Sequence, residues 1–313
     1  MHYRAILAYD GTAYQGFQRQ SAGKPSVQMA VESALATVIG QPIRVISAAR
    51  TDSGVHAAGQ VISFSADWSH GSATLLRAIN ATLPDDIAMQ RLNEAPAAFH
   101  PRFDAVSRTY RYQVYDAPVR NPLLARTAWQ VHGGQQGRLD LAPMNDAVAL
   151  LVGEHDFATF GSPTQGEATI RTLFRSAWRQ VAPVDQPDSP ESSEARLLWY
   201  DVEASGFLQH MVRALVGALV EIGLGKLSVT AFDEALRAAD RREGRWMAPP
   251  QGLTLLHVRY PAAISDALDR PDVRHFPYEP GANGPAMPRS ALAEHDLNPF
   301  ADRFADFVET ERL

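Results

Sequence analysis

The 313-residue chain contains no cysteine. Disulfides, thiolate nucleophiles and zinc sites with cysteine ligands are therefore excluded. Long apolar runs are also missing, because the longest one, "ALVGALVEIGLG" at 214–225, is short and is interrupted by Glu221. The first residues, "MHYRAILAYDGT", lack the apolar core of a signal peptide. We therefore expect a soluble, cytoplasmic protein with no membrane partner.

A basic surplus, the usual sign of a polyanionic partner, is absent too, since the formal net charge is −6. The charge is unevenly spread, however. Residues 262–313 hold ten acidic and five basic side chains, and residues 183–195 hold four acidic side chains and no basic one. Subtracting these charges of −5 and −4 from −6 leaves +3 for the rest of the chain. We expect a mildly basic body with two acidic, solvated extensions.

The apolar content of 45% is enough for a sizeable core, and the apolar periodicity divides the chain into two similar parts. Residues 3–95 show the order β-α-β-β-α-β, and residues 107–261 show a similar order with one further helix. This pattern predicts an α+β fold in which two ferredoxin-like βαββαβ halves share a mostly antiparallel sheet. A central cleft lies between the halves, and the helices cover the outer face.

The expected domains are an N-terminal half at 1–105, a C-terminal half at 106–261 with the acidic insertion 183–195, and an acidic extension with proline and glycine at 262–313. The expected strands are 3–11, 43–49, 60–66, 87–95, 107–116, 169–182, 196–205 and 253–261. The expected helices are 26–40, 72–83, 142–153, 207–224 and 228–239.

Ionisable residues gather on one predicted connection between strands, in the stretch "AARTDSGVHAAGQ" at 48–60. The Asp-Ser-Gly sequence by itself indicates an Asx turn, which needs neither Arg50 nor His56. The connection lies at the sheet end where a cleft would open. On these residues alone a plain turn is the favoured interpretation, and a role for Arg50, Asp52 or His56 in a cleft is the alternative.

Several stretches of the chain, taken in order, closely resemble the tRNA pseudouridine synthase A (TruA) family. A single such motif carries little weight, but together they span residues 3–261. The stretches are "YDGTAYQGFQRQ" with "SVQ", "ARTDSGVHA", "FHPRFDAVSRTYRYQVYD", "GEHDFATF", "GFLQHMVRALVG" and "GLTLLHVRYP".

The resemblance implies that uridine in tRNA is converted to pseudouridine, without a cofactor or a metal. It also implies targets at tRNA positions 38–40 in the anticodon arm, and a homodimer. It assigns the essential carboxylate to Asp52. A carboxylate can attack C1′ of the nucleotide or remove the 2′ proton to give a glycal, and both routes remain open.

The resemblance assigns substrate-binding roles to four more residues. Arg213 of "HMVR" would face the carboxylate of Asp52 and favour its ionised form. Arg50 would hold the target nucleotide or its phosphates. Tyr110 of "RTYRY" would stack on the target base and take part in proton removal from C5, and Leu253 would line the pocket. On sequence alone each residue also has an ordinary structural explanation. Arg213 suits a helix surface and Arg50 a solvated loop. Tyr110 suits the aromatic core face of a strand, and Leu253 suits an apolar core.

Two other functions remain open. A catalytically silent RNA-binding protein could use a similar sheet, although no RNP1-like stretch is present. A nucleoside hydrolase could use Asp52 on a free nucleoside. The product separates these functions, because hydrolysis releases uracil, whereas isomerisation retains the base and loses the hydrogen on C5. The histidines His56 and His210 are expected to be structural or to contact RNA.

Overall fold

Ten strands form a single sheet in the part of the chain that the computed structural model describes, which is residues 1–20, 23–133, 137–163, 166, 168–181, 195–261 and 264. The strand order is β4-β1-β3-β10-β5-β9-β8-β7, with β2 beside β3 and β6 beside β5. The pairs β10–β3 and β5–β6 are parallel, and the other pairs are antiparallel. The predicted α+β class and mostly antiparallel sheet are confirmed.

The first half contains six of the regular elements and the short 3₁₀ helix η1. Its strands lie in the order β4-β1-β3-β2, so the last strand of the half lies beside the first. This is the strand order of the split βαβ motif. The elements are β1 (His2–Tyr9), η1 (Gly11–Ala13), α1 (Val27–Ile39), β2 (Ile46–Ser47), β3 (His56–Ser65), α2 (Ser72–Asn80) and β4 (Ile87–Glu94).

The second half repeats this arrangement with the order β10-β5-β9-β8. Its last strand, β10, lies between β5 of its own half and β3 of the first half. The two halves therefore share one sheet. The elements are β5 (Ser107–Asp116), β6 (Trp129–Val131), α3 (Leu141–Ala149), β7 (Gly153–Asp156), β8 (Ile170–Val181), β9 (Arg196–Ala204), α4 (Met211–Gly223), α5 (Val229–Ala238), the 3₁₀ helix η2 (Pro250–Gly252) and β10 (Leu253–Arg259).

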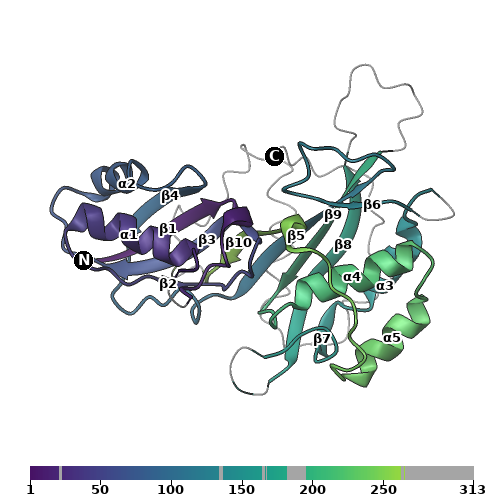
Figure 1. Ribbon diagram of the computed structural model, residues 1–313. Helices are drawn as coiled ribbons and strands as arrows, with labels where there is room; N and C mark the ends of the chain where they lie inside the picture. The colour runs from purple at the N-terminus through teal and green to yellow at the C-terminus, as the bar shows by residue number, and fades with distance from the viewer. Residues whose placement is uncertain are drawn as a thin grey trace, which may run out of the picture. The chain divides into compact units, whose positions relative to one another are not determined.

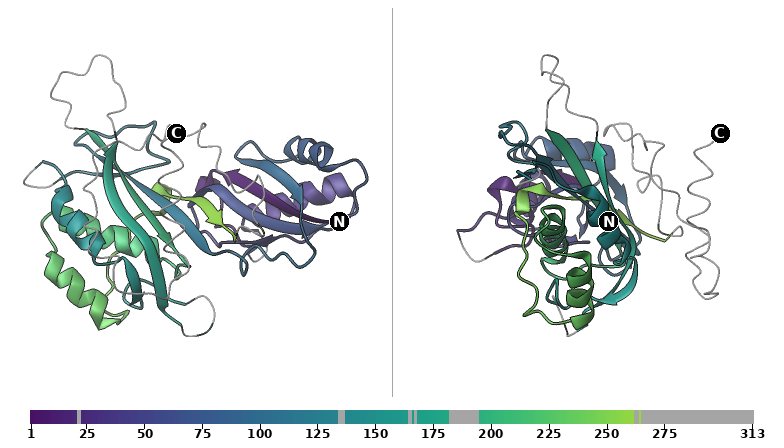
Figure 2. Two further views of the ribbon diagram at one scale, coloured as in Figure 1. Left: turned by 180° about the vertical axis from the view of Figure 1, so that it is seen from behind. Right: turned by 90° about the vertical axis from the view of Figure 1, so that its right-hand side faces the viewer.

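The helices of the described residues cover one side of this sheet. Figure 1 shows α1 and α2 against the strands of the first half, and α3, α4 and α5 against those of the second half. In the view from behind in Figure 2, β5, β8 and β9 run across the molecule with no helix in front of them. The central helix is α4, and nearly all of its residues are buried. None of the described helices is both long and apolar enough to span a membrane.

Two local predictions were wrong, and two short strands were not predicted. The expected strand 43–49 is regular only at β2, because the Val45 N–H donates to a carboxylate oxygen of Glu32 rather than to a neighbouring strand. The helix predicted from 207 begins at Met211, since His210 has a φ of 66°. Strands β6 and β7 were not predicted, because segments this short carry no clear alternation.

The predicted domain boundaries remain predictions. The position 105/106 falls between β4 and β5. The expected extensions 183–195 and 262–313 lie outside the described residues, apart from Ala195 and Ile264.

Candidate active site

A cleft of about 930 Å³ brings all five predicted site residues together. Arg50 and Asp52 come from the connection between β2 and β3, and Tyr110 comes from the middle of β5. Arg213 lies in the first turn of α4, and Leu253 opens β10. The cleft therefore draws on both halves of the chain.

The carboxylate of Asp52 lies at the N-terminal end of α4. Arg213 Nη1 donates a hydrogen bond of 3.3 Å to Asp52 Oδ2, and His210 Nε2 lies 3.7 Å from the same oxygen. Arg213 is itself held in place, because its Nε donates to the carbonyl of Ala248 at 2.8 Å. The Asp52 side chain is 23% exposed. A carboxylate that accepts a hydrogen bond from an anchored arginine and keeps an open side is oriented and can still reach a substrate.

The turn that carries Asp52 is closed by backbone groups. The Val55 N–H donates to the Asp52 carbonyl at 3.2 Å, and Gly54 has a φ of 77°. A positive φ at the third residue is the signature of a type II turn and explains the glycine. The side chain of Asp52 contacts Arg213 and His210. Its carboxylate is therefore directed to the cleft rather than used in an Asx turn.

Buried polar side chains hold the residues before this turn. The side chain of Gln60 accepts from the N–H of Ala49 at 3.2 Å and donates to its carbonyl at 2.8 Å. Tyr9 Oη lies 2.8 Å from Thr51 Oγ1. A Cβ at Gly16 would lie only 2.7 Å from the carbonyl oxygen of Thr51. The segment after β1 thus supports the connection that carries Asp52 by close backbone contact, which fixes Asp52 in place.

Tyr110 is nearly buried at the cleft wall. Its ring meets Phe207 edge-on, with ring centroids 5.2 Å apart. Burial raises the pKa of Tyr110 well above its usual value, and the nearby Tyr9 and Asp52 act in the same direction. The hydroxyl is therefore protonated at neutral pH. A protonated tyrosine can stack and donate a hydrogen bond, whereas accepting the C5 proton would require an ionised oxygen.

Buried tyrosines predict a loss of stability at high pH. Burial raises the pKa of Tyr9 from 10.0 to about 12, although hydrogen bonds from Thr51 and Gln60 oppose this shift. Below pH 10 the stabilisation is fully present, and between pH 10 and 12 the unfolded chain loses the proton while the folded chain keeps it. By pH 12 this difference at Tyr9 alone should lower the free energy of unfolding by about 2–3 kcal/mol. Urea unfolding from pH 8 to 11 measures how steeply the free energy of unfolding falls with pH. The fall should be less steep in Tyr9→Phe than in the wild type. Equal slopes in the two proteins would contradict the prediction.

The lining of the cleft is strongly cationic, which the sequence reasoning missed. Five arginines, Arg50, Arg102, Arg108, Arg171 and Arg213, line the cleft, and Asp52 is the only acidic residue among the described residues around it. Arg108 spans both halves, because it donates to the carbonyls of Ala48 at 3.3 Å and Ser205 at 3.0 Å. Arg108 lies two residues before Tyr110, and this spacing on one strand face could have indicated it. His210, expected from the sequence to be structural or to contact RNA, also lines the cleft.

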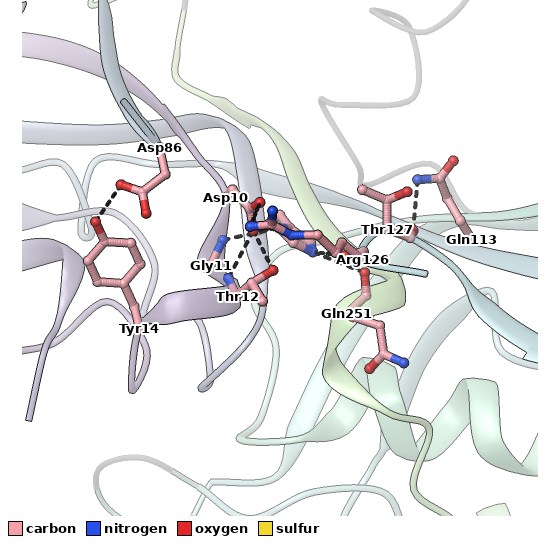
Figure 3. Close-up of polar contacts among 10 residues, drawn as sticks. Asp10, Gly11, Thr12, Tyr14, Asp86, Gln113, Arg126, Thr127 and Gln251 are labelled. Atoms are coloured by element: carbon pink, nitrogen blue, oxygen red, sulfur yellow. Dashed lines mark hydrogen bonds and ion pairs between the residues drawn. The ribbon is translucent and has the colours of Figure 1, made fainter. Parts of the chain in front are cut away.

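A second polar cluster, shown in Figure 3, connects the two halves at the end of β1. Arg126 Nη2 lies 2.7 Å from Asp10 Oδ2. His56 opens β3 rather than lying on the connection: its Nδ1 accepts from the Gly11 N–H at 3.1 Å, and its Nε2 donates to the carbonyls of Arg126 and Gln251. Burial opposes ionisation of Asp10, but hydrogen bonds from Thr12 and the nearby His56 and Arg126 hold its pKa below the usual value. These contacts support a structural role for His56.

The model of one protein family, described as tRNA pseudouridine synthase, matches residues 5–104 and 147–261, which include Arg50, Asp52, Arg213 and Leu253 but not Tyr110. The chain belongs to this family. The predicted membership in the pseudouridine synthases is therefore confirmed.

Curated relatives named tRNA pseudouridine synthase A match most of the chain. A protein of Neisseria gonorrhoeae (strain NCCP11945) is 39% identical over 268 residues, which is 85% of this chain and 94% of the relative. A protein of Geobacter sp. (strain M21) is 40% identical over 82% of this chain and 98% of the relative. A protein of Chloroflexus aurantiacus (strain ATCC 29366 / DSM 635 / J-10-fl) is 41% identical over 83% of this chain and 88% of the relative. The synthase family thus accounts for nearly the whole of the described chain.

Proposed function

We propose that this protein is a tRNA pseudouridine synthase, which isomerises uridine to pseudouridine in tRNA. The observation that carries the proposal is the ion pair between Asp52 and Arg213 in a cleft lined by arginines. Such a cleft attracts the phosphates of RNA. The carboxylate supplies the one reactive group that the isomerisation needs.

In the reaction the N1–C1′ bond breaks, the uracil turns, and a C5–C1′ bond forms. By the first route an oxygen of Asp52 attacks C1′ and uracil leaves with the bonding electrons. C5 then attacks C1′ and releases the carboxylate. By the second route Asp52 removes the proton on C2′ while uracil leaves C1′ with the bonding electrons, which gives a glycal. C5 then adds to C1′, and C2′ takes its proton back from Asp52. In both routes C5 finally loses its proton and N1 gains one, so the product is an isomer of the substrate.

The residues around Asp52 have defined tasks in this proposal. Arg213 orients the carboxylate, because it is itself anchored to the Ala248 carbonyl. Tyr110 and Leu253 supply an apolar wall that keeps water from the sugar intermediate, since attack by water would release the base. Arg50 is exposed on the lining and is placed to bind a phosphate.

We further propose that the substrate is the anticodon stem-loop, with targets at positions 38–40, and that the enzyme acts as a cytoplasmic homodimer. The support for these points is the resemblance to the synthase A family. Sedimentation of the full chain measures the oligomeric state, and sequencing of the modified tRNA measures the position.

The decisive experiment is tritium release from tRNA that carries [5-³H]uridine. Release of tritium with the base retained supports the isomerase. Free uracil would instead indicate a hydrolase, and binding of tRNA with neither product would indicate a silent RNA-binding protein. Both outcomes would overturn the proposed function.

Replacing Tyr110 by phenylalanine should reduce turnover by about 10–100-fold and change KM by less than about 3-fold, because the ring still stacks while the hydroxyl, which can donate a hydrogen bond to the reacting nucleotide, is lost. Steady-state kinetics on tRNA separate the two effects. Tyr200→Phe is the matched control, since Tyr200 is also buried, lies outside the cleft lining and has its hydroxyl 2.8 Å from Ser176 Oγ. If kcat and the affinity for tRNA fell by the same factor, the hydroxyl would have no role in the reaction and Tyr110 would act only by packing.

A further inference from the structure

Phe103 is an exposed aromatic residue at the edge of the cleft. The residue is 72% exposed, and it is the only phenylalanine among the exposed large hydrophobic residues of the described chain. It also lines the cleft that contains Arg50 and Asp52. An apolar ring held in water at the edge of a functional cleft is a candidate contact for a ligand.

The ring of Phe103 is held in one position. Its centroid lies 4.2 Å from that of the His100 ring, with the two planes 30° apart. The N–H groups of Arg102 and Phe103 both donate to His100 Nδ1 at 3.2 Å. Asp104 closes the same turn, because its carboxylate accepts from the His100 N–H at 2.8 Å. His100 thus backs the ring, and a ligand would lose little free energy in ordering it.

The charges around Phe103 suit a polyanion. The Arg102 guanidinium carbon lies 5.7 Å from the centre of the ring, and Arg108 donates to the Arg102 carbonyl at 2.5 Å. Both arginines line the cleft. Aromatic rings beside cations are the arrangement by which proteins bind single-stranded nucleic acids, with bases on the rings and phosphates on the cations.

We propose that Phe103 is a stacking platform for an unpaired RNA base that neighbours the target uridine. The proposal rests on the proposed function, because a uridine can reach Asp52 only by leaving its own stack. Unstacking costs free energy, and it also exposes the face of an adjacent base. Phe103 at the cleft edge replaces that lost contact and so favours the opened RNA.

The test uses an RNA stem-loop with 2-aminopurine placed on the 5′ or the 3′ side of the target uridine. Binding of the full-length protein should quench the fluorescence at one of these positions. Phe103→Ala should abolish the quenching and weaken RNA binding by about 10-fold, whereas Phe103→Tyr should retain both. Leu123→Ala is the matched control, since Leu123 is 89% exposed and lies outside the cleft lining. It should behave as the wild type.

Two results would overturn the platform. One is equal binding and quenching in Phe103→Ala and Leu123→Ala. The other is a change in oligomeric state with RNA binding intact, which would assign Phe103 to a contact between protein copies. Tritium release by the wild type tests the proposed function separately. Quenching that depends on Phe103 without tritium release would uphold the platform and reject the synthase.

Discussion

Replacing Asp52 by asparagine should reduce pseudouridine formation by roughly 10⁴-fold, the scale at which loss of one member of a catalytic group acts. An amide can neither attack C1′ nor remove a proton, so both routes fail. Binding of tRNA should change by less than about 3-fold, because in the proposed complex the arginines of the cleft contact the phosphates. Folding should be unaffected, since the Asp52 side chain is partly exposed and contacts Arg213 and His210, which line the cleft. Tritium release and filter binding measure the two effects.

The matched control for this variant is Asp233→Asn. Asp233 forms an ion pair with Arg237 at 2.7 Å, and its side chain is 25% exposed, but it lies on α5 away from the cleft lining. This control removes a paired aspartate of similar exposure without touching the site, and it should keep full activity. A tenth of wild-type turnover in Asp52→Asn would show that Asp52 is neither nucleophile nor base.

Replacing Arg213 by alanine should lower kcat by roughly 100-fold, since a hydrogen bond to a charged group contributes about 1.5–3 kcal/mol. The guanidinium donates to Asp52 through Nη1 and to the Ala248 carbonyl through Nε. Its loss removes the partner of the carboxylate and also loosens the segment before β10. Single-turnover rates on tRNA, measured beside urea unfolding, separate the effect on the reaction from an effect on folding.

Lysine at position 213 should restore only part of the rate. Its ammonium carries the charge but lacks the planar fork that reaches two acceptors at once. Full activity in Arg213→Lys would mean that charge alone suffices. Full activity in Arg213→Ala would separate Arg213 from the chemistry of Asp52.

The long regular elements were predictable from the sequence because they rest on local patterns. The apolar periodicity of 26–40 matches α1, where Ser26 caps the helix and Gly40 ends it with a φ of 82°. Strand β5 was predicted with its bounds, since its aromatic and β-branched residues favour an extended chain. Motif resemblance likewise indicated the synthase family, which the comparisons confirm.

The contacts that make the site could not be read from local patterns. Asp52 and Arg213 are separated by 161 positions, and they meet only because β10 joins β3 to β5 and α4 packs on the same side. The parallel β10–β3 pair has only two residues in register, a signal too small for any sequence period. The shortened β2 follows from Glu32, a helix residue whose carboxylate takes the N–H of Val45.

The sequence by itself therefore determined the class of fold, the family and the residue types available for chemistry. Each of these depends on residues close together along the chain or on a motif of known spacing. Only the tertiary structure decided that five arginines line one cleft, that His56 is held by backbone carbonyls, and that Phe103 remains in water. The exposure of a side chain and the clustering of charges depend on which segments pack together. These segments are far apart in the sequence, and they come together only when the chain folds.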